Sequence, residues 1–263
     1  MSSDDEHSAD DEDMATITPE RAALLQQFEQ WLQQPSTKSS RHFAPTRPHA
    51  ELFLRGSKWR VEKAKEKWAL FAELHDELGA CDVDTVTPVL VTEAQQVIPG
   101  AVDKRGRQVM YVVAENIDPK FQNERFARVR SSLYVLKRLC VGNVEVQAKG
   151  MIGVMDLHNA SLGTMTGMAD KDMGRLNAAF PLRVRSFIVV NSPWWVSLLM
   201  TAASYIMPAK QMKRVQQSSV ADLQRCIDRQ HLLKRFGGTV EYDAATFLAG
   251  DGGGGGSGCV GEK

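Results

Sequence analysis

Two small groups of basic residues stand on either side of a long uncharged stretch. Arg183 and Arg185 precede it, and Lys210, Lys213 and Arg214 follow it. Side chains two apart on a strand share a face, and side chains three and four apart share one side of a helix. Basic side chains gathered in this way bind phosphate oxygens, and Arg does so through a planar fork. The spacing therefore predicts a phosphate-binding surface, with a solvated basic face as the alternative.

The sequence gives little support to an enzyme. It contains no GxSxG nucleophile elbow, no P-loop, no HExxH zinc motif and no CxxxxxR phosphatase loop. Asp156 and His158 lie two apart at the end of a predicted strand, where α/β enzymes often hold their active sites. No nucleophile or metal-ligand spacing accompanies them, so an Asp that caps the following turn is the preferred interpretation. We expect no enzyme, no catalytic residue and no metal site.

The cysteines favour a reducing compartment. Cys81, Cys140, Cys226 and Cys259 are scattered, without CxxC or paired-histidine spacing. This arrangement is typical of free thiols and not of a disulfide framework or a zinc site. The N-terminus is acidic and lacks the apolar segment of a signal peptide. We therefore expect a cytoplasmic protein.

The charges are unevenly distributed, although the formal net charge of the 263 residues is zero. Residues 1–13 hold seven acidic residues and no Lys or Arg, which leaves a net charge of +7 on the remainder. A positive body attracts anionic partners such as a phosphorylated lipid surface. A disordered, solubilising tail is the alternative explanation of the acidic segment.

The 24 uncharged residues between Arg185 and Lys210 have the length of a membrane span but do not form one continuous helix. Asn191, Ser192 and Pro193 interrupt them, and proline disfavours helix at the residue before it. The part after the break, about sixteen residues, forms ~24 Å of helix, whereas the hydrocarbon core is ~30 Å thick. Apolar residues occupy two sides of this part. The pattern is typical of a core helix, or of a lid that covers a ligand and also contacts a membrane.

The N-terminal region predicts a small all-helical unit over residues 16–80. Thr18 is a suitable N-cap with Pro19 at the first helical position, and apolar residues line one side of residues 18–33. Residues 51–79 carry a second apolar stripe at spacings of three and four, formed by Val61, Ala64, Trp68, Phe71, His75 and Leu78. We interpret the histidine of this stripe as a core residue and not as a ligand.

The character of the sequence changes after residue 80. Short apolar, β-branched runs predict strands, and helical spacing occurs between them. The predicted strands are residues 107–117, 149–157 and 183–191, and the predicted helices are residues 121–140 and 168–180. This alternation predicts an α/β fold with a mostly parallel sheet covered by helices, over residues 81–249. An acidic tail (1–15) and a glycine-rich tail (250–263) are predicted to be disordered.

Several stretches together resemble the CRAL-TRIO lipid-binding proteins, which include retinaldehyde-binding, α-tocopherol transfer and phosphatidylinositol transfer proteins. FLRGSKWRVEKAKE is similar to the helical N-terminal module, DKRGRQVMYV to the first sheet strand and GMIGVMDLHNAS to the strand ending in Asp. AAFPLRVRSFIVVNSPWW, KQMKRV and LLKRFGGTVEYD are similar to the following strand, the gate helix and the closing segment. These stretches keep the family's order over about residues 50–248. The family's usual Leu-Pro before Gly-Gly is replaced here by Lys234-Arg235-Phe236.

The resemblance implies that the helices and the sheet enclose a lipid pocket closed by a gate helix. The implied pocket residues are Tyr111, Val113, Phe126, Tyr134, Ile152, Val154, Phe187, Val189 and Trp195. The implied gate residues are Trp194, Trp195, Leu198, Leu199 and Ile206. Arg183, Arg185, Lys210 and Arg214 match positions that contact phosphoinositide headgroups in tocopherol-transfer-like members, whereas Lys213 has no basic counterpart there.

Two hypotheses follow. The first is a lipid-binding and transfer protein, without a cofactor, that associates reversibly with phosphoinositide-containing membranes. The second is a regulatory module that senses lipid without transferring it, a role that the resemblance to the modules attached to phosphatases and small-GTPase regulators implies. In this chain the acidic tail or the glycine-rich tail would bind a protein partner. We expect no nucleic-acid partner. Retinoids, tocopherol-like molecules, phosphatidylinositol and other phospholipids all remain open as the ligand.

Overall fold

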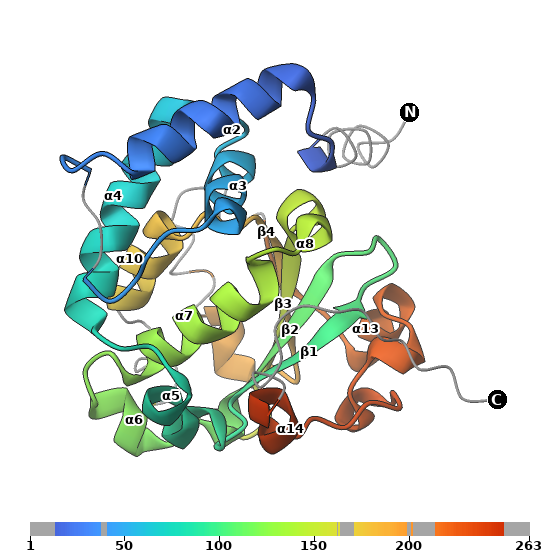
Figure 1. Cartoon of the computed structure of the whole chain (residues 1–263). Helices are drawn as coiled ribbons and strands as arrows, with labels where there is room; N and C mark the ends of the chain where they lie inside the picture. The colour runs from blue at the N-terminus through green and yellow to red at the C-terminus, as the bar shows by residue number, and fades with distance from the viewer. Residues whose placement is uncertain are drawn as a thin grey trace.

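The computed structural model describes residues 14–37, 41–161, 163, 171–198, 201 and 214–249. Its centre is a five-stranded sheet with helical segments on both faces, next to a layer of N-terminal helices (Figure 1). The predicted fold class, an α/β chain with a mostly parallel sheet covered by helices, is confirmed.

The N-terminal unit contains α2 Pro19–Leu32, α3 Arg47–Gly56 and α4 Val61–Leu78. α2 begins where the sequence predicts, because Thr18 accepts a hydrogen bond from the Arg21 amide at 3.3 Å and a proline occupies the first turn. α4 buries the predicted stripe, including His75 at 2% exposure, and ends at Gly79 with a φ of +71°.

Residues 14 and 15, predicted as the end of a disordered tail, pack on this unit instead. Met14 is buried, and the Arg55 guanidinium donates to the backbone oxygens of Met14 at 2.5 Å and Ala15 at 2.7 Å. Arg55 is itself buried and lies over the ring of Trp59. Two charge-assisted hydrogen bonds therefore anchor this segment. Residues 1–13 and 250–263 lie outside the described residues.

The sheet has the strand order β1-β2-β3-β4-β5. The strands are β1 Gln95–Val102, β2 Gln108–Val113, β3 Met151–Asp156, β4 Val184–Val190 and β5 Val215–Gln217. β1 pairs antiparallel with β2, and the later neighbours are parallel. β2, β3 and β4 correspond to the three predicted strands, and the register places Met110, Gly153 and Phe187 side by side.

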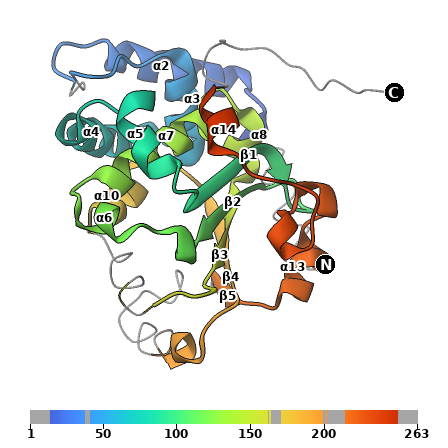
Figure 2. The same cartoon turned by 90° about the horizontal axis from the view of Figure 1, so that it is seen from below.

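Different parts of the chain cover the two faces of the sheet. The helices of the first face are α5 Val83–Leu90, α6 Pro119–Asn123, α7 Ala127–Cys140 and α10 Lys171–Ala179, and α8 Val144–Lys149 leads from α7 into β3. The second face carries α13 Val220–Cys226 and the short 3-10 turns η2 Arg229–His231 and η3 Lys234–Phe236. Figure 2 shows the sheet between these two groups. A further short turn, η1 Ala114–Asn116, follows β2, and α14 Ala244–Ala249 packs against α5 and β1.

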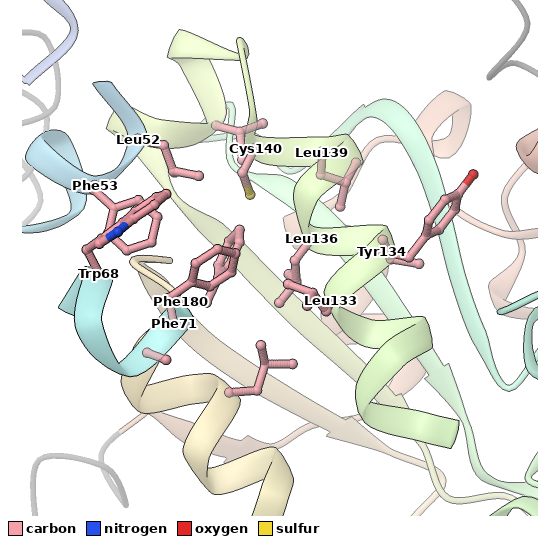
Figure 3. Packing of buried hydrophobic residues seen from close by; sticks show 14 of the residues in the cluster. Leu52, Phe53, Trp68, Phe71, Leu133, Tyr134, Leu136, Leu139, Cys140 and Phe180 are labelled. Atoms are coloured by element: carbon pink, nitrogen blue, oxygen red, sulfur yellow. The ribbon is translucent and has the colours of Figure 1, made fainter. Parts of the chain in front are cut away.

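The largest core cluster joins the N-terminal helices to the sheet domain. Figure 3 shows Phe53 of α3 and Trp68 of α4 near Phe180, with the leucines of α7 alongside. A Cβ at Gly56, the last residue of α3, would lie 2.1 Å from the backbone oxygen of Pro181, so the two parts touch backbone to backbone. The two predicted units, residues 16–80 and 81–249, therefore share one hydrophobic core.

Candidate functional site

A cavity of about 250 Å³ lies between the first face of the sheet and the helices that cover it. The sheet contributes Met110, Val112, Met155, Val184 and Phe187 to its wall. α6, α7 and α10 contribute Phe121, Leu136 and Met173. A concave site with such an apolar lining accommodates a hydrophobic ligand.

Gly153 makes room in this wall. It pairs in the sheet with Met110 on one side and Phe187 on the other. A Cβ at Gly153 would lie 2.6 Å from Cδ1 of Phe187, so the aromatic ring lies across the glycine where a side chain would otherwise stand. The position of the Phe187 ring, and with it the shape of the cavity, therefore depends on a residue without a side chain.

Polar side chains of β1 and α7 interrupt the apolar wall. The Ser132 hydroxyl donates to Oε1 of Gln95 at 3.2 Å, and Nε2 of Gln95 donates to the sulfur of Met110 at 3.2 Å. The neighbouring Ser131 hydroxyl donates to the backbone oxygen of Arg128 at 3.0 Å, within its own helix. All five residues line the cavity. Ser132 and Gln95 thus place hydrogen-bonding groups in otherwise apolar surroundings.

The structure places one of the nine implied pocket residues, Phe187, in the wall of this cavity. Tyr111, Ile152 and Val154 lie on the second face of the sheet, in the cluster formed with α13 and η3. The Tyr111 ring stacks on Phe236 at 5.9 Å, and its hydroxyl donates to the backbone oxygen of His231 at 2.9 Å. Because successive side chains of a strand point to opposite faces, these three residues do not line the cavity.

The other implied pocket residues are also packed elsewhere. Val113 is fully buried. It stands two residues after Tyr111 on β2 and therefore points to the same, second face of the sheet. Val189 and Trp195 pack in a small cluster with Met155 and do not line the cavity. Phe126 and Tyr134 belong to the main core, where Tyr134 meets Phe247 edge to face. α7 presents Leu136 and the two serines to the cavity in their place.

The two basic residues at the start of β4 have structural contacts. Arg183 donates to the backbone oxygen of Ala148 at 2.8 Å, and Arg185 donates to that of Lys149 at 3.0 Å. These carbonyls belong to the last turn of α8, where positive charge stabilises a helix. A register shift in the β3–β4 pairing lies between Val184 and Ser186, at Arg185, and both guanidinium groups bind the same end of α8.

The remaining basic residues are only partly described. Arg214 lies just before β5, and its backbone oxygen accepts a hydrogen bond from the Phe187 amide at 2.7 Å. Lys210 and Lys213 lie outside the described residues. The structure therefore brings Arg183 and Arg185 together and places Arg214 at the strand beside them.

The implied gate begins directly after β4. Residues 194–198 are helical, with Val196 buried against the sheet and Trp195 partly buried. Trp194 and Leu198 are 84% and 68% exposed, and they stand four residues apart on the outer side of the same turn. Leu199 and Ile206 lie outside the described residues. Among the helices that the structure describes, none is long and apolar enough to cross a membrane.

Asp156, at the end of β3, has a structural role. It is 1% exposed, and its Oδ1 accepts hydrogen bonds from the His158 amide at 3.1 Å and from Nδ2 of Asn191 at 2.9 Å. Oδ2 pairs with the Arg235 guanidinium at 2.7 Å. Arg235 also hydrogen-bonds to Glu115 and lowers the pKa of that carboxyl group. The predicted capping role of Asp156 is confirmed, and within the described ranges no group of side chains could hold a metal ion.

Comparison with known proteins gives a family match over more than half of the chain. The profile of the CRAL/TRIO domain matches residues 93–238. Tyrosine-protein phosphatase non-receptor type 9 from Mus musculus and from Homo sapiens is 24% identical over 120 residues, which is 45% of this chain. The match covers 20% of each phosphatase, so the matched part of this chain spans about a fifth of the length of these relatives.

A solved structure shows the same fold. The crystal structure of Sfh5 superposes with a TM-score of 0.54 over 80% of this chain and 84% of that chain. The sequence identity in this superposition is 10%, so the likeness concerns the fold alone.

Proposed function

This chain belongs to the CRAL/TRIO domain family, and from that premise we propose that it binds one hydrophobic lipid in the cavity beneath the sheet. The observation that carries the proposal is the apolar wall formed by residues such as Met110, Met155 and Phe187. Burial of a lipid chain contributes about 0.8 kcal/mol per CH₂ group, so even a short chain is held well in such a site. The proposal assigns a binding function and no catalytic step.

The proposed activity includes transfer of the bound lipid between membranes, with the helix that begins at Trp194 as the gate. Val196 anchors the first turn of this helix, whereas Trp194 and Leu198 face outward. Tryptophan favours the interface between water and lipid. A membrane that binds these side chains in the open state shifts the population toward that state and admits the ligand.

The proposed docking surface for phosphoinositide headgroups consists of Arg183, Arg185, Lys210, Lys213 and Arg214. Its support is the convergence of Arg183 and Arg185 on the end of α8, together with the position of Arg214 at the neighbouring strand. Bonds to backbone carbonyls fix where these guanidinium charges lie, which reduces the entropy lost on binding a phosphate. Docking of this kind would act at the cytoplasmic face of a membrane.

The experiment that tests ligand binding is native mass spectrometry of the purified full chain, followed by extraction and identification of any released small molecule. The expected result is one lipid per chain, either carried from the expression host or taken up from vesicles. A protein that is empty and takes up no lipid from vesicles would mean that the cavity is not a lipid site.

Docking is tested separately by transfer of a labelled lipid between vesicles with and without phosphatidylinositol bisphosphate. The double variant Arg183→Glu/Lys210→Glu is expected to lose the dependence on this lipid and most of the transfer. Arg229→Glu, an exposed arginine of η2 on the second face, is the control for a change of charge. Transfer that is unchanged in the double variant would exclude the proposed docking surface.

A second function, lipid sensing without transfer, has one observation in its favour. The curated relatives are phosphatases of which the matched part is a fifth, so the same type of sequence also occurs as one part of a longer protein. In this alternative, the tails bind a protein partner when the cavity is occupied. A chain that is loaded with lipid but moves none between vesicles would favour it.

A further inference from the structure

Gln95 has an unusual hydrogen-bonding environment for a side chain in an apolar wall. Its Oε1 accepts from the Ser132 hydroxyl at 3.2 Å, but its Nε2 donates to the sulfur of Met110 at 3.2 Å. A thioether is a weak acceptor, whereas a carboxamide nitrogen carries two good donors. The Gln95 amide therefore presents an N–H group at the cavity, and a ligand oxygen would accept a stronger hydrogen bond from it than the Met110 sulfur does.

The Ser132 hydroxyl completes a small polar subsite. Ser132 is 9% exposed and its hydroxyl donates to Gln95, so the oxygen lone pairs can accept a hydrogen bond from a ligand. A ligand group that both accepts from the amide and donates to the hydroxyl is an alcohol or a phenol, and a carbonyl satisfies the amide alone. We propose, on the basis of the lipid-binding function above, that Gln95 and Ser132 bind the uncharged oxygen end group of a single-chain lipid in the cavity.

The charges of the wall favour an uncharged end group. Arg128 and Asp118 are the cation and the anion among the described lining residues, and their charges offset each other. A buried phosphate would need more positive charge than this. The walls around the Gln95–Ser132 pair are otherwise formed by residues such as Met110 and Leu136.

The size of the cavity favours one chain over two. Its volume of about 250 Å³ is slightly below the range of about 300–1,000 Å³ that is typical of small-molecule sites. A single chain with a small polar end fits such a space better than a phospholipid with two acyl chains. The inferred ligand class is therefore a neutral, single-chain lipid with a hydroxyl or carbonyl end.

Three probes of equal chain length test this inference: decan-1-ol, decane and decyl phosphate. Their affinities for the full chain are measured by competition in native mass spectrometry. The variants are Gln95→Met, which keeps the length of the side chain, and Ser132→Ala. Gln230→Met is the matched control, because it makes the same change at an exposed glutamine of η2, on the second face of the sheet and outside the cavity.

The wild-type chain is expected to prefer decan-1-ol to both other probes. Gln95→Met should weaken decan-1-ol about threefold to tenfold, as expected for one neutral hydrogen bond, and leave decane unchanged. Ser132→Ala should act in the same direction, and Gln230→Met should have no effect.

Two results would overturn the subsite while leaving the lipid-binding function intact. One is an equal effect of Gln95→Met on decan-1-ol and decane, which would mean that the side chain only shapes the cavity. The other is a wild-type preference for decyl phosphate, which would mean that the site takes a charged headgroup. A wild-type chain that binds none of the three probes and takes up no lipid from vesicles would overturn the lipid-binding function itself.

Discussion

The carboxylate of Asp156 and the guanidinium of Arg235 form an ion pair of 2.7 Å between the end of β3 and the turn η3. Asp156 is buried and Arg235 is partly exposed, so the arginine neutralises a charge that the fold has removed from water. The arginine stands in the segment Lys234–Phe236, directly before Gly237 and Gly238. In this chain an ion pair thus joins the C-terminal segment to the strand ends.

Removal of this arginine is expected to destabilise the fold. Arg235→Gln should lower the free energy of unfolding by about 2 kcal/mol, because it leaves the carboxylate of Asp156 buried without its cation. The double variant Asp156→Asn/Arg235→Gln should lose less than the sum of the two single losses. Urea unfolding of the four proteins at pH 7 measures this coupling. Losses that simply add would show that the two side chains do not stabilise each other.

Gly153→Ala is expected to change the cavity more than the stability of the sheet. The new Cβ would lie 2.6 Å from Cδ1 of Phe187, so the ring must turn toward the cavity and reduce its volume. Lipid occupancy in native mass spectrometry should fall severalfold. Gly174→Ala in α10 is the control: no atom lies within 4 Å of its new Cβ, and replacing a helical glycine should stabilise the chain by about 0.5–1 kcal/mol. Unchanged lipid occupancy in Gly153→Ala would show that the position of the Phe187 ring does not affect ligand binding.

Local periodicity was sufficient to predict most of the secondary structure. The stripe of α4 and the β-branched runs of β2, β3 and β4 are patterns within single segments, and each is found where the sequence predicts it. β1 was missed because Pro99 and Gly100 lie inside it, at an edge where a break in the pairing is tolerated. β5 was missed because it has only three residues.

The face of the sheet that holds the cavity could not be predicted from local patterns. Both alternating sets of β2 are apolar, Met110 and Val112 on one face and Tyr111 on the other. The choice depends on where η3 and Phe236 return to cover the second face, which is a contact between residues far apart in the sequence. Gly153 was the one local signal, because a glycine inside a strand indicates that another group approaches closely.

The stability of the fold should decrease in mild acid because of His75. Burial, and then the charges of Lys137 and His42, lower the pKa of His75 to about 4 from an ordinary value of 6.5, while Asp76 opposes the shift. His49, in the same cluster around Phe43, has its pKa lowered to about 4 as well, mainly by burial. Between pH 6.5 and 4 the unfolded chain binds protons that the folded chain does not, so stability is full above this window and falls as the pH falls through it.

The size of this effect can be measured with a single substitution. His75 should account for a loss of about 1–2 kcal/mol between pH 7 and pH 5, and His75→Gln should reduce the slope of unfolding free energy against pH accordingly. Urea unfolding at several pH values gives that slope. A His75→Gln variant with the wild-type slope would show that this histidine is not responsible.

The outer face of residues 194–198 should determine contact with membranes but not the binding of the ligand. Trp194→Ala/Leu198→Ala removes the two most exposed large apolar side chains of the described chain, and vesicle binding should weaken about tenfold or more. Leu70→Ala removes another exposed leucine, on α4, and should leave vesicle binding unchanged. Because Val196 still anchors the first turn, lipid occupancy in native mass spectrometry should stay at the wild-type level. Normal vesicle binding by the double variant would exclude this turn as the membrane contact, whereas a parallel loss of occupancy would mean that the two side chains support the cavity instead.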